Sequence, residues 1–205
     1  MRRTTLAAGC AVLVFTLTSC TGGGDRDGAE ADPGDTSAEQ ATVVEPDPVT
    51  AFGPDCADFP REGPGSLAAM AEQSLTDAVA ATPLLERLSF ALDRSGLAPG
   101  LDAAEDLTLF APINDAFDMY PDPEIHDLFS DPAALARLLG RHVVLDEVAG
   151  ADLSGATFET LGGARIRTDE SEGEYTVDGY APVVCADVRT ADATVHVASM
   201  LLIPS

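Results

Sequence analysis

Apolar residues between positions 65 and 140 recur at the spacing of an α-helix. Leu85, Leu88 and Leu92 lie three and four residues apart and the run ends at Gly96, which predicts one amphipathic helix. Two further stripes each follow an Asp-Pro pair, a combination that favours a helix start because proline has no N–H to donate. These stripes are Ile125, Leu128 and Phe129, then Leu135, Leu138 and Leu139.

The pattern changes to that of β-strands after residue 142. Short apolar runs alternate with turns rich in Gly, Asp and Glu, which is typical of hairpins. The predicted strands are residues 143–145, 157–161, 165–167, 175–177, 181–188, 194–197 and 200–203. One more strand, residues 107–110, lies among the helices. Helices grouped before strands predict an α+β fold rather than an alternating α/β fold.

Residues 107–117, with the sequence LTLFAPINDAF, have the most informative pattern in the chain. Residues 107–110 alternate faces as a strand, and Pro112 ends that strand because it has no N–H for the ladder. Asn114 can then cap a short helix that begins at Asp115.

Three segments in this order resemble the fasciclin (FAS1) domain family. Residues 107–117 are similar to its first signature block, and residues 195–204, VHVASMLLIP, are similar to its terminal block around His196. Between them, RHVV at residues 141–144 occupies the place of a Tyr-His pair. The resemblance covers roughly the last 140 residues, a usual domain size. It implies the FAS1 fold, a wedge of two small β-sheets with helices along one edge.

The start of this region resembles the secreted and lipoprotein fasciclin-domain antigens of mycobacteria. Those proteins have a Gly-Pro-x-Cys opening and a second Cys in a late Val-Cys strand, and Cys56 and Cys185 occupy these places here. The resemblance implies a disulfide between them, worth about 5 kcal/mol in the chain-entropy model. The alternative is two separate buried thiols. The Ala-rich composition and the use of Arg without Lys are typical of an actinobacterial source.

The N-terminal residues have the features of a bacterial lipoprotein signal. Arg2 and Arg3 precede an apolar run at residues 6–17, which is shorter than the roughly 20 residues of a spanning helix. The sequence LTSC that follows has the form of a lipobox, so we expect a signal peptide over residues 1–19 and lipidation of Cys20. Its acyl chains would anchor the protein at the outer face of the cytoplasmic membrane. A plain secretory signal, and hence a secreted protein, is the alternative.

Acidic and small residues dominate residues 20–50, which we expect to form a disordered linker before a single fasciclin domain at residues 51–205. The whole chain has 35 acidic residues against 11 basic ones, for a net charge of −24. This charge repels nucleic acid and opposes self-association, so we expect a monomer without a nucleic-acid partner.

The histidines and acidic residues form no recognisable catalytic or metal-binding set. The family resemblance implies that His142 hydrogen-bonds within the core near Asn114 and Asp115, and that His196 packs among the last strands. The sequence contains neither G-x-S-x-G nor H-E-x-x-H, and its acidic clusters lack the spacing of a calcium loop. We therefore expect no enzyme activity, no metal and no cofactor.

Two functions fit these features. The first is cell adhesion or protein interaction at the cell envelope, with an envelope or extracellular protein as the partner. Arg141 replaces the Tyr of the family's adhesive Tyr-His pair, which argues against receptor binding through that motif. The alternative is an envelope binding protein for an apolar small molecule or lipid, which predicts a closed apolar pocket.

Overall fold

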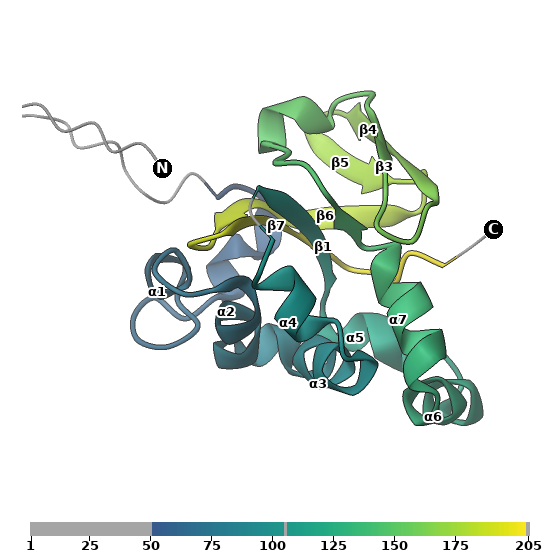
Figure 1. Ribbon diagram of the computed structural model, residues 1–205. Coiled ribbons are helices and arrows are strands. Elements are labelled where there is room, and N and C mark those ends of the chain that lie inside the picture. The colour runs from purple at the N-terminus through teal and green to yellow at the C-terminus, as the bar shows by residue number, and fades with distance from the viewer. Residues whose placement is uncertain (1–50, 105, 204–205) are drawn as a thin grey trace, which may run out of the picture. The chain divides into compact units, whose positions relative to one another are not determined.

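The computed structural model describes residues 51–104 and 106–203, which all belong to one compact unit (Figure 1). The expected signal peptide at residues 1–19, the lipidated Cys20 and the linker at residues 20–50 lie outside the described residues. Within the described ranges, no helix reaches the length and hydrophobicity that a membrane crossing requires.

Helices make up most of residues 51–140. Asp131 caps the last of them, because its Oδ1 accepts hydrogen bonds from the Ala133 and Ala134 N–H groups at 2.9 and 3.1 Å. Gly96 ends α3 in the left-handed region at φ 74°, as its position in the sequence predicts. The helices are η1 (Pro54–Asp58), α1 (Leu67–Met70), α2 (Leu75–Ala81), η2 (Pro83–Leu85), α3 (Glu86–Ser95), α4 (Ala98–Leu101), α5 (Asn114–Asp118), α6 (Asp122–Ser130) and α7 (Pro132–Gly140).

Seven strands are hydrogen-bonded in the order β2-β1-β7-β6-β5-β4-β3. β1 and β7 are parallel, and the other neighbours are antiparallel. The helices before the strands and the mixed sheet confirm the α+β class. The strands are β1 (Leu107–Pro112), β2 (Val143–Val144), β3 (Thr157–Glu159), β4 (Arg165–Ser171), β5 (Glu174–Val177), β6 (Ala181–Arg189) and β7 (Ala193–Ala198), and η3 (Gly150–Leu153) precedes β3.

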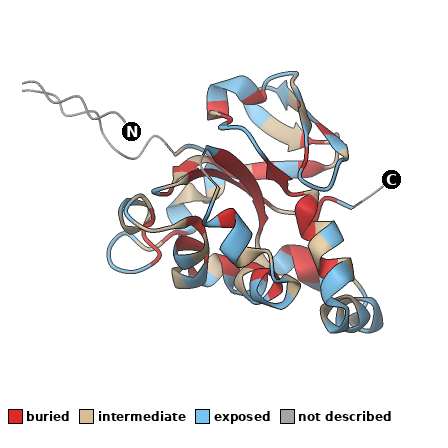
Figure 2. Ribbon diagram, viewed as in Figure 1, coloured by how far each residue is buried: buried red, intermediate tan, exposed pale blue. Residues whose placement is uncertain are grey.

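β1 and β7 form the centre of the core, and all six residues of each strand are buried (Figure 2). Leu109 and Val195 face the helices, where they join the larger apolar cluster. Phe110 faces the opposite side and joins a second cluster with Ile166 and Leu202. Side chains alternate across a strand, so this pair is covered on both faces and has no exposed position in its pattern.

β6 connects the inner strands to the outer hairpin of β4 and β5. Its register against β7 shifts twice, between Val183 and Cys185 and between Cys185 and Val188. Asp187, inside the second shift, has a positive φ of 61°. Bulges bend a strand and increase its twist. The outer strands β3–β5 therefore turn away from the plane of β1 and β7, as Figure 1 shows.

The Cys56–Cys185 disulfide is confirmed, with a Cα–Cα distance of 5.0 Å. It joins η1 to β6. Phe52 and Ala186 reinforce the junction by exchanging two backbone hydrogen bonds of 3.0 and 2.7 Å. Gly53 permits this close approach, because a Cβ at that position would overlap the Val184 carbonyl oxygen.

The strand predicted at residues 200–203 is wrong. This segment has no regular structure, although Leu201 and Leu202 are buried. Buried apolar runs have the same sequence pattern whether or not a strand lies beside them. Side chains, rather than a neighbouring strand, satisfy its backbone: Leu202 N–H donates to His142 Nε2 at 3.0 Å and Ile203 N–H donates to the Tyr180 hydroxyl at 2.9 Å.

Candidate functional site

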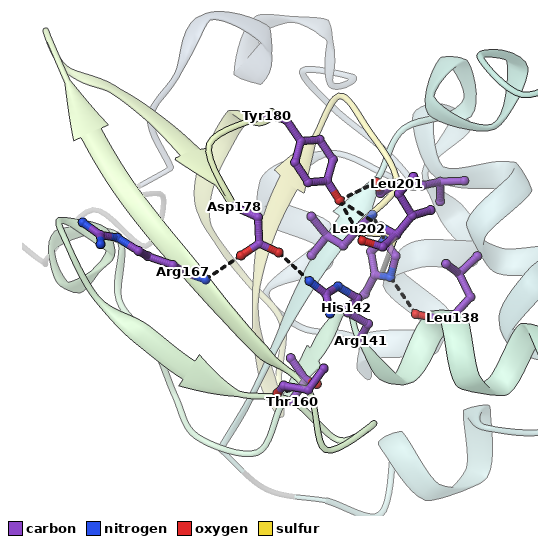
Figure 3. Close-up of polar contacts among 11 residues, drawn as sticks. Leu138, Arg141, His142, Thr160, Arg167, Asp178, Tyr180, Leu201 and Leu202 are labelled. Carbon is purple, nitrogen blue, oxygen red and sulfur yellow. Dashed lines mark hydrogen bonds and ion pairs between the residues drawn. The ribbon is translucent and has the colours of Figure 1, made fainter. Parts of the chain in front are cut away.

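His142 lies at the junction of α7, β2 and the C-terminal segment, and it is fully buried (Figure 3). Its Nε2 accepts a hydrogen bond from the Leu202 N–H, so this nitrogen carries no proton. Nδ1 therefore carries the proton and donates it to the Leu138 carbonyl at 3.0 Å. Burial lowers the pKa of His142 from 6.5 to about 4, which outweighs the opposing effect of the Leu138 hydrogen bond. The imidazole is thus neutral, and both of its nitrogens are hydrogen-bonded.

The expected contact between His142 and the Asn114–Asp115 pair is wrong. The ring bonds to Leu138 and Leu202, while Asn114 bonds to a different part of the chain and Asp115 lies exposed in the first turn of α5. Strand pairing sets this distance. The His142 carbonyl accepts a hydrogen bond from the Phe110 N–H in β1, so His142 lies beside a residue four positions before Asn114.

Asn114 stabilises α3 instead of its own helix. Its Oδ1 accepts a hydrogen bond from the Arg87 N–H at 3.0 Å, and its Nδ2 donates to the Pro83 carbonyl at 2.8 Å. Arg87 is in the first turn of α3, and Leu85 before that helix offers no capping side chain. The expected cap on α5 is therefore wrong, because Asn114 caps a helix earlier in the chain.

Arg141 forms a largely buried ion pair with Asp178, in the turn between β5 and β6. Its Nη2 lies 2.7 Å from Asp178 Oδ2, and the two side chains are only 14% and 19% exposed. Asp178 Oδ1 also accepts the Arg167 N–H at 2.8 Å. The position that carries Tyr in the family pattern is thus used here to join α7 to the outer hairpin (Figure 3).

His196 is the second buried imidazole, in the middle of β7. Its Nδ1 accepts from the Asp187 N–H at 3.2 Å, so Nε2 carries the proton and donates to the Val148 carbonyl at 2.9 Å. The ring packs against Phe110 with 5.4 Å between centroids. Burial lowers the pKa of His196 to about 4.

A family model named Fasciclin domain matches residues 83–204 of the chain. The chain belongs to the fasciclin domain family. It is 32% identical to cell surface glycolipoprotein MPB83 of Mycobacterium bovis over 82% of this chain and 79% of that protein. It is 34% identical to immunogenic protein MPB70 of the same species over 74% of this chain and 81% of that protein.

A solved structure shares this fold at low sequence identity. It is a FAS1 domain pair from the insect cell adhesion molecule Fasciclin I, with a TM-score of 0.53 and 19% identity over 65% of this chain and 52% of that chain. The fasciclin fold inferred from the sequence is therefore confirmed.

Three residues of this site were missed by sequence reasoning: Asp178, Tyr180 and Leu202. The Tyr180 hydroxyl accepts the Ile203 N–H, and burial raises its pKa above the usual value of 10.0. The Asp-Gly pair at 178–179 signals a turn. The partners of that turn were not evident, because Arg141 and Asp178 are 37 positions apart.

The ring nitrogens of both buried imidazoles of this fasciclin domain are hydrogen-bonded to backbone groups. General acid–base catalysis requires a proton-transfer group within reach of a substrate, and both rings are enclosed. The side chain of the third histidine, His126, is 82% exposed on α6. Over the described ranges, no group of three or more His, Cys, Asp and Glu residues is arranged to hold a metal ion.

An exposed apolar surface lies at the helical end of the domain. Phe90 of α3 is 55% exposed, and its ring lies 5.6 Å from that of Phe129 in α6. Together with Ile125 these residues line a hollow of about 510 Å³, whose rim carries Glu86 and Arg87. We call Phe90, Ile125 and Phe129 the α3–α6 face.

Proposed function

We propose that this chain is a non-enzymatic interaction domain of the cell envelope, anchored by lipid on Cys20 at the outer face of the cytoplasmic membrane. The lipobox supports the anchor, and the 32% identity to MPB83, a cell surface glycolipoprotein, supports the location. The acidic residues 20–50 would act as a spacer between the lipid and the domain.

The α3–α6 face is the observation that carries the interaction role. The exposed Phe90 ring, beside the half-buried Phe129 and Ile125, leaves apolar surface in water, which is typical of protein–protein contacts.

The location of this face fits a tethered protein. The described chain begins at Ala51, next to β6, and α6 lies at the far side of the domain (Figure 1). The α3–α6 face is therefore remote from the point where the linker joins the domain, which leaves it accessible to a partner. A role in adhesion or protein interaction is in keeping with the cell adhesion molecule that shares the fold.

The alternative of an apolar ligand has less support. An almost wholly apolar hollow lies between α6, α7 and the C-terminal segment, lined by residues that include Leu128, Leu138 and Leu201. Its volume is about 210 Å³. Ligand pockets usually hold roughly 300–1,000 Å³, so this hollow is too small to enclose a lipid.

Anchoring is tested by metabolic labelling with palmitate in the host bacterium. The wild-type protein should incorporate the label. The Cys20→Ser variant should not be labelled and should appear in the medium, because residue 20 then has no thiol to receive the diacylglyceryl group. An unlabelled wild-type protein would refute the anchor and leave the secreted form.

The interaction surface is tested by site-specific photocrosslinking on intact cells. A photoreactive phenylalanine replaces Phe90 in one variant and Leu145 in the other, because Leu145 is 57% exposed and lies after β2, outside the α3–α6 face. We expect discrete protein adducts from position 90 and none from position 145. Equal adducts from both positions would contradict a role for this face.

A further inference from the structure

Three arginines converge on one hollow beside the candidate site. The hollow has a volume of about 470 Å³, and we call it the arginine pocket. Its lining residues are Arg141, Arg165, Arg167, Asp169, Asp178, Gly179, Tyr180 and Ile203.

The charge of this pocket is opposite to that of the domain. Residues 51–205 contain eight arginines and 27 acidic residues, a formal charge of −19. The pocket holds three of those arginines and only two aspartates, a formal charge of +1. A locally positive hollow on so acidic a surface is unexpected if charges are distributed only for solubility.

Two of the arginines are held by structural contacts. Arg141 pairs with Asp178, and Arg167 binds Asp169 Oδ1 through its Nε and Nη2 at 3.0 and 2.7 Å. Asp178 also accepts the Arg167 N–H, so one carboxylate fixes both walls of the pocket. The guanidinium groups are therefore positioned before any ligand arrives, which lowers the entropy lost on binding.

Hydrogen-bond donors remain unused in this pocket. Arg165 forms no ion pair or side-chain hydrogen bond within residues 51–104 and 106–203. Arg141 Nε is buried and has no hydrogen-bond partner in the same part of the chain. A buried unsatisfied donor costs free energy, and a ligand that accepts a hydrogen bond from it would remove that cost.

Strand geometry directs these groups to the same side. Arg165, Arg167 and Asp169 alternate along β4 with the buried Ile166 and Thr168, so the three charged side chains share the outer face. Tyr180, held by its hydroxyl to the C-terminal segment, and Ile203 add an apolar wall.

We propose that the arginine pocket binds a small oxyanion, a carboxylate or a phosphate, with Arg165 and Arg141 as its donors. Guanidinium groups match these planar or tetrahedral oxyanions through paired N–H donors. Arg141 already pairs with Asp178, whereas Arg165 has no ion-pair partner among the described residues and would gain one from a bound anion. This proposal is independent of the α3–α6 face.

The test is an NMR titration of the ¹⁵N-labelled full chain in a maltoside detergent, whose headgroup carries no phosphate. Inorganic phosphate and hexanoate are added separately at constant ionic strength, and the arginine Nε–H resonances are followed. We expect saturable shifts of the Arg141 and Arg165 signals at millimolar concentrations with at least one of the two probes. Saturation by phosphate alone identifies a phosphate site, and saturation by hexanoate alone identifies a carboxylate site.

Matched variants separate a built site from general charge attraction. Arg165→Gln should weaken binding about tenfold or more, because it removes a charged donor that has no role in the fold. Arg137→Gln removes an exposed arginine of α7 that does not line the pocket, and it should leave the affinity unchanged. Linear, unsaturable shifts with both probes, or equal losses in the two variants, would overturn the proposal.

Discussion

At the scale of single residues, polar side chains in this domain connect segments that are distant in the sequence. Asn114 caps α3 from the start of α5. At the end of α4, the Asp102 carboxylate accepts hydrogen bonds from the N–H and the hydroxyl of Thr76 in α2. Asn114 therefore supplies a cap that α3 lacks locally, whereas Asp102 adds a tertiary contact to the local Ser74 cap of α2. Their loss should loosen the packing between helices as well as the helix ends.

Asn114→Ala should lower the free energy of unfolding by about 1–2 kcal/mol, because it removes the N-terminal cap of α3 and leaves the Pro83 carbonyl without its donor. Urea unfolding measures this change. Asn114→Asp retains the acceptor for Arg87 N–H and should lose less. An alanine variant as stable as wild type would refute the capping role.

At the scale of elements, the segment before α1 depends on its link to β6. η1 has no buried residue of its own, so the disulfide, the Phe52–Ala186 bridge and the edge contact of the Phe52 ring with Tyr175 hold it in place. The sequence separation of the two cysteines is 129 residues. A crosslink over such a length strongly restricts the unfolded chain.

Replacing both Cys56 and Cys185 by Ala should destabilise the domain by up to about 5 kcal/mol, the loop-closure value for this separation. This loss makes global unfolding easier for every amide, and local opening of the η1–β6 junction should add to it. In hydrogen exchange, the amides of Phe52 and Ala186 should lose protection while that of Leu109 in β1 remains protected under native conditions. Uniform loss of protection across all three amides would contradict a local role for the bridge.

At the scale of the whole molecule, two neutral imidazoles couple stability to pH. His142 and His196 have pKa values lowered to about 4, against 6.5 for an exposed histidine. Above pH 6.5 the two histidines are neutral in both the folded and the unfolded chain, so the full stability is present. As the pH falls from 6.5 towards 4, the unfolded chain gains protons that the folded chain excludes, so stability is lost. The loss approaches about 3 kcal/mol for each histidine.

His142→Gln should make stability less dependent on pH between 6.5 and about 4, because glutamine offers a similar donor and acceptor but does not titrate. The measurement is urea unfolding at a series of pH values, with the slope compared between variants. Carboxylates also protonate in this range and reduce the repulsion within a domain of charge −19, so the variant comparison isolates the histidine.

His126→Gln is the matched control, because that imidazole is 82% exposed and forms no core contact. Its slope should equal that of wild type. A His142→Gln variant with the wild-type slope would show that His142 does not remain neutral in the folded state.

The sequence by itself determined the local features of this protein. The start of α7 follows from Asp131-Pro132, the end of α3 from Gly96, and the exposed faces of β4 from its alternation, because each depends on neighbours within four residues. The family resemblance added the fold and the pairing of Cys56 with Cys185.

Only the tertiary structure decided which polar groups meet. Leu202 N–H lies 60 positions from His142, Asn114 lies 27 positions from Arg87, and Arg141 lies 37 positions from Asp178. Sequence periodicity reports which face of an element is buried, but it does not report which other element covers that face. The partners of His142 and Asn114, and the arginine pocket, exist because β1 and β7 bring the ends of α7, β5 and the chain together.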